Sequence, residues 1–206
     1  MKHLEAFDFG VSREAEAKLR DYLALLLRWN AHINLVADRD AETVWRRHVL
    51  DSLQLLPLLP ETEEPLVDIG AGAGFPGLML AVATGRPTHL VESDRRKAAF
   101  LNEAARVLGL AGTVVVHASR IEVASLPQAA ILTARALASL PDLLAHAHRL
   151  LKPGGVALFP KGRTVDQELT AAAAGWTMRI ERFPSRTDPS AIILRLSEIS
   201  PVAASA

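Results

Sequence analysis

Apolar residues recur at intervals of three and four positions near the start of the chain, which is typical of an amphipathic helix. The residues on this apolar face are Leu19, Tyr22, Leu23, Leu26 and Leu27. Ser12 is a suitable N-cap because its hydroxyl can accept a hydrogen bond from a free N–H of the first turn. Trp29-Asn30 and Asn34 mark the predicted end of this helix.

A second helix is predicted from about Glu42 to Leu56, with apolar positions that include Val44, Val49 and Leu53. Pro57 stops it, because proline lacks the N–H that a helix interior needs. The polar stretch Glu61–Pro65 is then a linker. We therefore predict a helical extension over residues 1–60 and a second region over residues 61–206, the two forming one compact unit.

After Pro65 the pattern changes to short apolar or β-branched runs that alternate with helical segments. The predicted strands are Leu66–Ile69, Thr88–Glu92, Thr113–His117, Ala129–Thr133 and Val156–Phe159. The helices between and after them begin near Pro76, Asp94, Ser139 and Thr164. Strands separated by helices form parallel βαβ units, whose sheet is covered on both faces.

The end of the chain has a different pattern, with two strands predicted at Trp176–Phe183 and Ser190–Ser197. The turn-rich segment Pro184–Pro189 that joins them is too short for a parallel crossover, so the two strands must be antiparallel. The expected fold is α/β and Rossmann-like, with a mostly parallel seven-stranded sheet that ends in an antiparallel hairpin.

The segment Asp68–Gly77, Asp-Ile-Gly-Ala-Gly-Ala-Gly-Phe-Pro-Gly, follows a predicted strand and opens a helix. Its glycines let the backbone turn tightly and approach a ligand closely. Gly72-x-Gly74-x-x-Gly77 matches the dinucleotide fingerprint, although that match alone is weak. Two features favour S-adenosylmethionine instead. The carboxylate of Asp68 suits a cationic sulfonium better than a pyrophosphate, and the C-terminal hairpin is foreign to the dinucleotide fold.

Glu92 ends the second predicted strand, 22 residues after Gly70. In open parallel sheets, ligands bind beyond the carboxyl ends of the strands. A carboxylate at this place can accept hydrogen bonds from both hydroxyls of an adenosine ribose. We therefore predict that Gly70, Gly72, Gly74 and Glu92 bind the cofactor.

Composition narrows the class of protein. The chain has 206 residues, of which 50% are hydrophobic and 22% charged, and it contains no cysteine. This composition is that of a globular protein, and it excludes a thiolate nucleophile and a zinc–thiolate site. No apolar run approaches the length of a membrane span, and the first residues lack the apolar core of a signal peptide. We expect a soluble cytoplasmic protein.

Charge is unevenly distributed although the formal net charge is zero. The segment from Glu92 to Arg163 has ten Lys and Arg against five Asp and Glu, a net charge of +5. Residues 1–91 have nine against thirteen, a net charge of −4. A locally positive surface that attracts a phosphate backbone is therefore possible on a neutral protein.

At these residues the chain resembles a class I S-adenosylmethionine-dependent methyltransferase, and more narrowly the bacterial family once called glucose-inhibited division protein B. The resemblance extends from about Arg13 to Leu196. Its segments are Trp29-Asn30 with Asn34-Leu35, Arg47-His48-Val49-Leu50-Asp51-Ser52, Asp68–Gly77, Ser119-Arg120-Ile121-Glu122, Ala134-Arg135-Ala136, Leu151-Lys-Pro-Gly-Gly155 and Pro160-Lys161-Gly162. The resemblance implies methyl transfer to N7 of a guanine in the decoding-region loop of small-subunit (16S) ribosomal RNA.

The resemblance also implies that Gly70, Phe75, Ile121, Glu122 and Arg135 line the cofactor pocket. Ile121 can pack on the adenine face, and Glu122 can accept from the adenine amino group. The guanidinium of Arg135 suits either the methionine carboxylate or an RNA phosphate. Because N7 already has a lone pair, transfer to it needs no general base and depends on alignment. Arg135 is therefore the one catalytic candidate, as a hypothesis.

Basic side chains near the predicted site are candidates for contact with RNA phosphates. They are Arg46, Arg47, Arg95, Arg96, Lys97, Lys161 and Arg163. Arg95–Lys97 could instead be only an exposed first helical turn. His48, Asp51 and Ser52 are expected to form a hydrogen-bonded cluster rather than a catalytic triad, since no nucleophile elbow accompanies them. His146 and His148 point apart on a helix, so no metal site is expected.

Three alternatives remain open at this stage. The chain could be a class I methyltransferase of a small molecule or a protein, a nicotinamide-dependent oxidoreductase, or a non-enzymatic RNA-binding module. The last leaves the glycine loop unexplained. The expected partner is small-subunit ribosomal RNA or the ribosomal subunit, with no membrane, and the expected state is a monomer.

Overall fold

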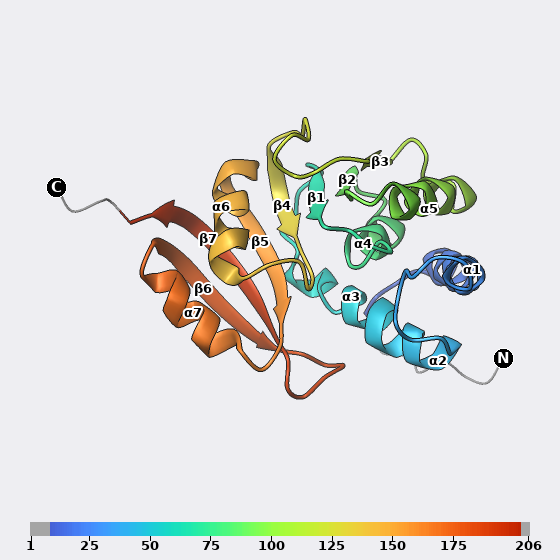
Figure 1. Cartoon of the computed structure of the whole chain (residues 1–206), viewed down its shortest axis with the longest axis horizontal. Helices are drawn as coiled ribbons and strands as arrows, with labels where there is room; N and C mark the ends of the chain where they lie inside the picture. The colour runs from blue at the N-terminus through green and yellow to red at the C-terminus, as the bar shows by residue number, and fades with distance from the viewer. Residues whose placement is uncertain (1–8, 203–206) are drawn as a thin grey trace.

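A seven-stranded sheet with the strand order β3-β2-β1-β4-β5-β7-β6 forms the centre of the protein in a computed structural model that describes residues 9–202 (Figure 1). Strands β1 to β5 run parallel, and β7 lies antiparallel between β5 and β6. This confirms the predicted sheet and hairpin. The strands are β1 (Leu66–Ile69), β2 (Thr88–Val91), β3 (Val114–His117), β4 (Ala129–Thr133), β5 (Leu151–Lys161), β6 (Trp176–Pro184) and β7 (Ile192–Pro201).

Most strand limits agree with the prediction within two residues, and β5 differs most. The predicted strand began at Val156, after the sequence Lys-Pro-Gly-Gly at residues 152–155. Instead, β5 already begins at Leu151, which pairs with Ala129, and a bulge between Ala129 and Ile131 accommodates the glycine segment. A bulge of this kind lets irregular residues stay within a strand.

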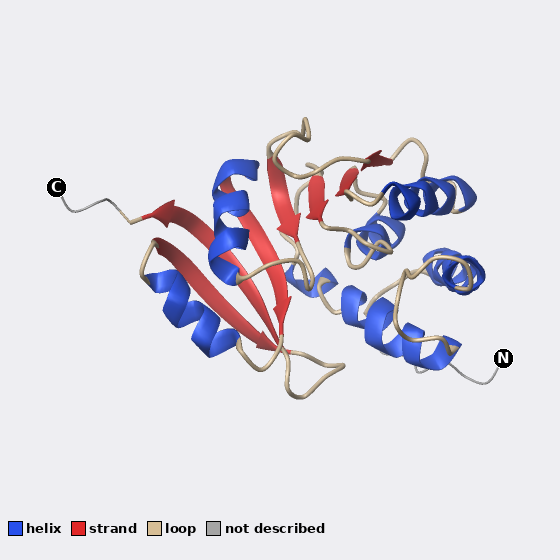
Figure 2. Ribbon diagram, in the orientation of Figure 1, coloured by secondary structure: helices blue, strands red, loops and turns tan. Residues whose placement is uncertain are grey.

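Helices cover both faces of the sheet (Figure 2). The helices α1, α4 and α5 share one apolar cluster, and α6 packs with α7 on the other face in a second cluster. The main helices are α1 (Arg13–Asn30), α4 (Gly77–Thr84), α5 (Arg95–Val107), α6 (Leu140–Leu150) and α7 (Val165–Ala173). Among residues 9–202, no helix is both long and apolar enough to cross a membrane.

The segment predicted as a second helix is interrupted. It consists of α2 (Ala41–Val44), a π-helical stretch η1 (Trp45–Leu50), α3 (Asp51–Leu53) and a 3-10 turn η2 (Leu56–Leu58). A single helix ending at Leu56 was therefore wrong in detail, and Pro57 lies inside the 3-10 turn. π-Helical turns frequently occur at functional sites, and this one carries His48.

The N-terminal helix α1 is fixed to the glycine loop. Ser12 caps it by accepting from the backbone N of Ala15 at 3.1 Å, as predicted. Buried Tyr22 donates to the carbonyl oxygen of Ala73, and its ring meets that of Phe75 edge-on at 5.6 Å. Residues before position 60 thus support the loop directly, while the predicted division at residue 60 stays a prediction.

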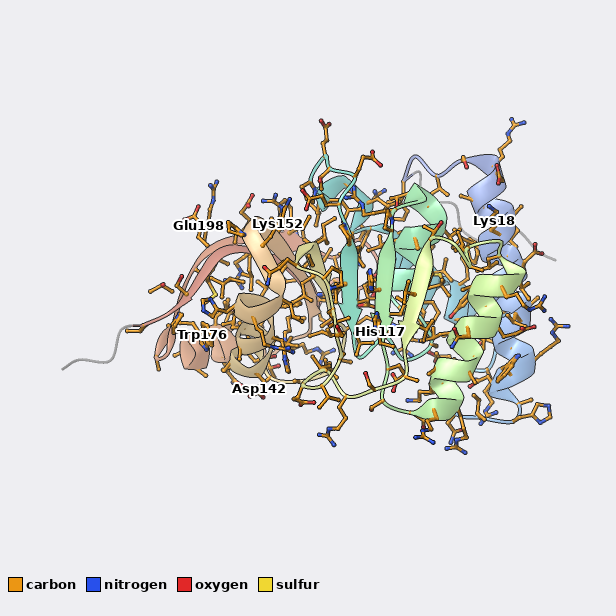
Figure 3. All side chains as sticks on the ribbon, turned by 90° about the horizontal axis from the view of Figure 1, so that it is seen from above. Lys18, His117, Asp142, Lys152, Trp176 and Glu198 are labelled. Atoms are coloured by element: carbon orange, nitrogen blue, oxygen red, sulfur yellow. The ribbon has the colours of Figure 1, made fainter. Side chains whose placement is uncertain are left out.

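The carboxyl ends of the parallel strands share one edge of the sheet. Figure 3 shows His117, the last residue of β3, near one edge and Lys152, close to the start of β5, near the opposite one. Loops that follow β1, β2, β3 and β4 therefore meet at a single edge, where parallel sheets bind ligands.

Candidate active site

A cavity of about 1060 Å³ opens at the carboxyl edge of the sheet. Loops after β1, β2, β3, β4 and β5 line it, together with the π-helical segment and the loop between β6 and β7. Of the predicted cofactor residues, all but Gly74 lie in its wall. Those in the wall are Gly70, Gly72, Phe75, Glu92, Ile121, Glu122 and Arg135.

Two glycines of the loop, Gly70 and Gly74, combine a positive φ with no room for a Cβ. Gly70 has a φ of +67°, and a Cβ there would lie 2.5 Å from Cδ1 of Leu137. Gly74 has a φ of +96°, and its Cβ would lie 2.8 Å from Cβ of Leu78. Positive φ strains any side-chain-bearing residue. Gly74 is therefore required for packing beneath the loop, which differs from its predicted contact with the cofactor.

Glu92 fastens the glycine loop to the end of β2. Its Oε2 accepts from the backbone N of Gly72 at 2.8 Å, and its Oε1 accepts from the backbone N of Asp94 at 2.7 Å. Each carboxylate oxygen keeps a second lone pair. Glu92 is 8% exposed and lines the cavity, so those lone pairs are available to two ribose hydroxyls.

Asp68 does not face the cavity, and the prediction that its charge favours a sulfonium was wrong. Its side chain turns under the loop, where it is 1% exposed. Oδ2 accepts from the backbone N of Gly77 at 3.0 Å, and Oδ1 accepts from Oγ1 of Thr133 at 2.6 Å. Burial raises the pKa of Asp68 to about 7, against the opposing hydrogen bonds from Thr133 and Gly77. The carboxyl group braces the loop from below.

Replacing Asp68 by asparagine should remove part of the pH dependence of stability. Because burial raises the pKa of Asp68, the folded protein keeps a proton that the unfolded chain releases, and the free energy of unfolding falls as pH rises from about 4 to about 7. Asparagine does not titrate, yet it can accept from Gly77 and donate to Thr133. Denaturant unfolding at about pH 5 and about pH 8 measures this difference. If the free energy of unfolding fell by the same amount between these two pH values in the wild type and in Asp68→Asn, the assignment of the raised pKa to Asp68 would be contradicted.

Arg135 joins the end of β4 to the π-helical segment. Its Nη1 donates to the carbonyl oxygen of Arg47 at 3.1 Å and to Oδ2 of Asp51 at 3.2 Å, and its Nη2 donates to Nδ1 of His48 at 2.9 Å. Its guanidinium lies 5.2 Å from the ring centroid of Phe75, a cation–π contact. The guanidinium of Arg135 thus contacts four residues of the cavity wall.

His48 is held as a neutral imidazole. A guanidinium only donates, so Nδ1 must be the acceptor of the bond from Arg135, and Nε2 then donates to Oδ2 of Asp38 at 3.1 Å. Burial, followed by the charge of Arg135, lowers the pKa of His48 to about 4. Its ring stacks on Phe75 at 5.1 Å. The predicted cluster of His48 and Asp51 is present, and Ser52 joins it through the carbonyl oxygen of His48.

The loop between β6 and β7 closes another side of the cavity, which the sequence analysis did not predict. Gln54 is 3% exposed, and its Nε2 lies 3.2 Å from Oγ of Ser185 and 3.3 Å from Oγ1 of Thr187. Thr187 also donates to Oδ1 of Asp51 at 2.6 Å. Turn residues in Pro184–Pro189 indicated only a connection, because pairing between segments so distant in sequence leaves no local pattern.

Ile121 and Glu122 follow β3 in the cavity wall. Ile121 is partly buried against the apolar cluster of the α6 face. Glu122 is exposed, and its Oε2 lies 3.6 Å from Nε of Arg120. An apolar side chain beside an acceptor at the end of β3 agrees with the roles that the resemblance assigned them toward adenine.

The predicted RNA-contacting cations fall into three groups. Arg47 and Lys97 line the cavity, whereas Arg46, Arg95, Arg96 and Arg163 are exposed outside its wall. Lys161 differs from the prediction, because its side chain is only 10% exposed. Its Nζ donates to Oε2 of Glu168 at 2.7 Å and to the carbonyl oxygen of Ala138 at 3.2 Å. Lys161 thus ties β5 to the start of α6, and its charge is paired internally.

Taken in order along the carboxyl ends of the strands, these residues fit the successive parts of S-adenosylmethionine. Ile121 and Glu122 suit the adenine, the free lone pairs of Glu92 suit the ribose, and the open backbone at Gly72 allows close approach, since the nearest atom to a Cβ there is 3.9 Å away. Arg135 follows β4, across β1 from Glu92 in the strand order, and its guanidinium suits the carboxylate at the methionine end.

Comparisons with known proteins show which proteins this chain is similar to. A family model described as rRNA small subunit methyltransferase G matches residues 15–187. The ribosomal RNA small subunit methyltransferase G of Rhodospirillum centenum is 58% identical over 193 residues, covering 94% of this chain and 88% of the relative. The protein of the same name from Granulibacter bethesdensis is also 58% identical, covering 94% of this chain and 90% of the relative.

Solved structures with similar folds are more distant in sequence. M. jannaschii TYW2 in complex with AdoMet gives a TM-score of 0.58 at 15% identity, covering 75% of this chain and 76% of that one. An O-methyltransferase from Bacillus cereus in complex with SAH gives a TM-score of 0.59 at 16% identity, covering 86% and 91%. At these identities the likeness concerns the fold.

Proposed function

The chain belongs to the rRNA small subunit methyltransferase G family, and from this we propose that it methylates N7 of a guanine in the decoding-region loop of small-subunit (16S) ribosomal RNA. Membership establishes an S-adenosylmethionine-dependent methyltransferase of that RNA. What we propose beyond this is the methylated atom, N7 of a guanine, and its place in the decoding-region loop.

The state of His48 is the observation that best supports N7 as the acceptor. Both ring nitrogens of this imidazole are engaged, one by Arg135 and one by Asp38. His48 is therefore not free to remove a proton from a substrate. Guanine N7 has a lone pair and no proton to lose, so transfer to it needs alignment of the reacting atoms rather than a base.

The chain's own residues bind and orient the reactants. S-adenosylmethionine, when bound, supplies a methyl group on a positively charged sulfur. Glu92 holds the ribose, Ile121 and Glu122 hold the adenine, and the glycine loop lets the backbone approach. Arg135 orients the methionine end and is itself fixed by Asp51 and His48. A rigid set of positioning groups of this kind is what an in-line transfer requires.

Exposed cations around the cavity are proposed to hold RNA phosphates. The first turn of α5 contains Arg95, Arg96 and Lys97 but no acidic residue. Cations are unfavourable at a helix N-terminus because they meet the positive end of the helix dipole. The N-cap carboxylate of Asp94, which accepts from the backbone N of Arg96 and of Lys97, offsets part of this cost, and an RNA phosphate would offset more of it. Arg46, Arg47 and Arg163 extend the same basic surface around the cavity mouth.

Replacing both Arg95 and Arg96 by glutamine should weaken RNA binding and flatten its salt dependence. Loss of two phosphate contacts lowers the slope of log affinity against log salt by roughly 1.5. Cofactor affinity should not change. Titration of RNA at several salt concentrations measures the slope. Replacing Arg179 and Arg182, which are exposed on the edge strand β6, is the matched control, and an equal change in that control would contradict the proposed surface.

The proposed reaction is tested with small ribosomal subunits from a strain that lacks this protein. Labelled S-adenosylmethionine is supplied, and the RNA is then cleaved chemically at N7-methylguanine. Label at N7 of one guanine in the decoding-region loop is the expected result. Label on another atom, at another place in the RNA, or on no RNA at all would contradict the proposal.

We also propose that the protein acts in the cytoplasm, where ribosomal subunits are found, and as a monomer. Light scattering of the protein alone and with RNA measures the oligomeric state.

A further inference from the structure

The cavity continues past the cofactor residues to the loop between β6 and β7. Its volume of about 1060 Å³ is at the upper end of the roughly 300–1,000 Å³ of a pocket for one small ligand. Ser185, Thr187 and Asp188 lie in its wall. The cavity therefore has room for a second group beside the cofactor.

The loop between β6 and β7 is held rigidly in place. Gln54 contacts both hydroxyls at Ser185 and Thr187, and its Oε1 accepts from the backbone N of Arg186 at 2.8 Å. The backbone N of Asp188 lies 3.2 Å from Oγ of Ser185, and the backbone N of Ala191 donates to the carbonyl oxygen of Asp188 at 3.0 Å. A loop fixed in this way can present a side chain in a defined direction, which binding sites require.

A chain of contacts places this loop on the other side of Arg135 from the glycine loop. Phe75 of the glycine loop contacts Arg135, and Arg135 donates to Oδ2 of Asp51. Oδ1 of Asp51 accepts from Thr187, which precedes Asp188. An acceptor base that points its reactive atom toward the glycine loop would thus have its far edge near Asp188.

Asp188 differs from the other carboxylates in the cavity wall. Its Oδ1 accepts from the backbone N and the hydroxyl of Ser190, both at 2.8 Å, while its Oδ2 accepts no hydrogen bond within residues 9–202. In Asp51, Glu92 and Glu168, both oxygens already accept hydrogen bonds from this chain. Glu122 follows β3, at the proposed adenine end.

Asp188 is also kept ionised. The backbone N–H and the hydroxyl of Ser190, with smaller effects of the charges of Arg163 and Arg47, lower the pKa of Asp188. Those two arginines belong to the proposed phosphate-binding surface. A free carboxylate oxygen between phosphate-binding cations suits a nucleobase that carries hydrogen-bond donors.

Guanine is such a base. It presents N1–H and the 2-amino group as donors, and the 2-amino group lies across the ring system from N7. We propose that the loop between β6 and β7 forms the acceptor-base subsite and that Asp188 is its specificity-determining residue, accepting from N1–H and the 2-amino group of the target guanine. This inference rests on the proposed function, because N7 must face the cofactor.

The contact would also become stronger during the reaction. The N7 lone pair forms the new bond to the methyl carbon, the carbon–sulfur bond breaks with its electron pair going to sulfur, and no proton leaves. The guanine ring becomes a cation, so its N1–H becomes more acidic and donates more strongly to Asp188. An interaction that strengthens toward the transition state raises the rate of transfer and not only the affinity.

The test compares Asp188→Asn with the wild type on subunits reconstituted with guanosine or inosine at the target position. Inosine lacks the 2-amino group. Wild type should lose roughly 10- to 100-fold in kcat/KM on inosine, as expected when a hydrogen bond to a charged group is lost. Asp188→Asn should lose a similar factor on guanosine, mainly in kcat, and then only about 3-fold more on inosine. Affinity for S-adenosylhomocysteine should not change.

A control variant separates recognition of the base from a general effect of lost charge. Asp21→Asn changes an exposed aspartate on α1 outside the cavity, and it should stay within about 3-fold of wild type. An undiminished inosine penalty in Asp188→Asn, or an equal loss in Asp21→Asn, would overturn the inference. Label on an atom other than N7 would contradict the proposed function, while the inosine comparison would still decide the role of Asp188.

Discussion

Replacing Arg135 by alanine is expected to lower methyl transfer by about 100-fold or more, a loss typical of removing one preorganised donor from an active site. The substitution removes the donor from Oδ2 of Asp51 and Nδ1 of His48 and uncovers Phe75. Asp51 also accepts from Thr187. The substitution therefore removes support from the loop between β6 and β7, which binds the acceptor base, as well as from the residues that bind the cofactor. Single-turnover transfer to small subunits, with cofactor affinity measured separately, gives the size of the effect.

The conservative variant Arg135→Lys keeps the charge but cannot reproduce the planar fork that serves three acceptors. It should recover only part of the lost rate. Arg106→Ala, which removes an exposed arginine paired with Glu103 on α5, is the matched control and should transfer normally. An Arg135→Ala protein that kept full turnover and full cofactor affinity would refute the role of Arg135.

Replacing Glu92 by glutamine is expected to weaken binding of S-adenosylhomocysteine by about 100-fold, since the charge-assisted bonds to two ribose hydroxyls are each worth about 1.5–3 kcal/mol. A glutamine amide would also turn its NH₂ group toward the backbone N–H of either Gly72 or Asp94, both of which now donate to Glu92. The glycine loop would then lose its anchor at β2. Isothermal titration measures the affinity.

The melting temperature of Glu92→Gln without ligand shows whether the fold is retained. Loss of a single hydrogen bond costs only about 1 kcal/mol, so the fold should persist while ligand-induced stabilisation disappears. Glu103→Gln changes a half-buried glutamate on α5 that pairs with Arg106 and lies outside the cavity wall, and it should bind normally. Wild-type affinity in Glu92→Gln would exclude the ribose contact.

The fold could be predicted largely because its elements have local patterns. The alternation of apolar runs and helices after Pro65 was sufficient for the parallel sheet, and the short turn after Phe183 required an antiparallel hairpin. The π-helical stretch from Trp45 to Leu50 has no comparable local pattern, and the contact of His48 within it joins a residue far along the chain, Arg135. Sequence periodicity could indicate a helix there but not its altered turn.

The sequence placed Gly70 and Glu92 correctly in the wall of the cavity, because a residue that follows a parallel strand lies at the carboxyl end of the sheet. Their contacts with the cofactor stay predictions. The direction of a side chain such as that of Asp68 could not be predicted. Asp68 lies two residues before Gly70, the first glycine of the loop. Its side chain nevertheless turns beneath the loop, where its oxygens accept hydrogen bonds from Thr133 and Gly77. Gln54 and Asp188 lie more than one hundred residues apart in sequence, and only the folded chain brings the two segments together.

The measurement that tests the central claim most directly is a crystal structure of the protein with S-adenosylhomocysteine. The ribose hydroxyls should contact Glu92, the adenine should lie between Ile121 and Glu122, and the sulfur should face the space between Arg135 and the loop that carries Asp188. A ligand bound with its ribose away from Glu92, or with its sulfur turned away from that space, would contradict the site described above.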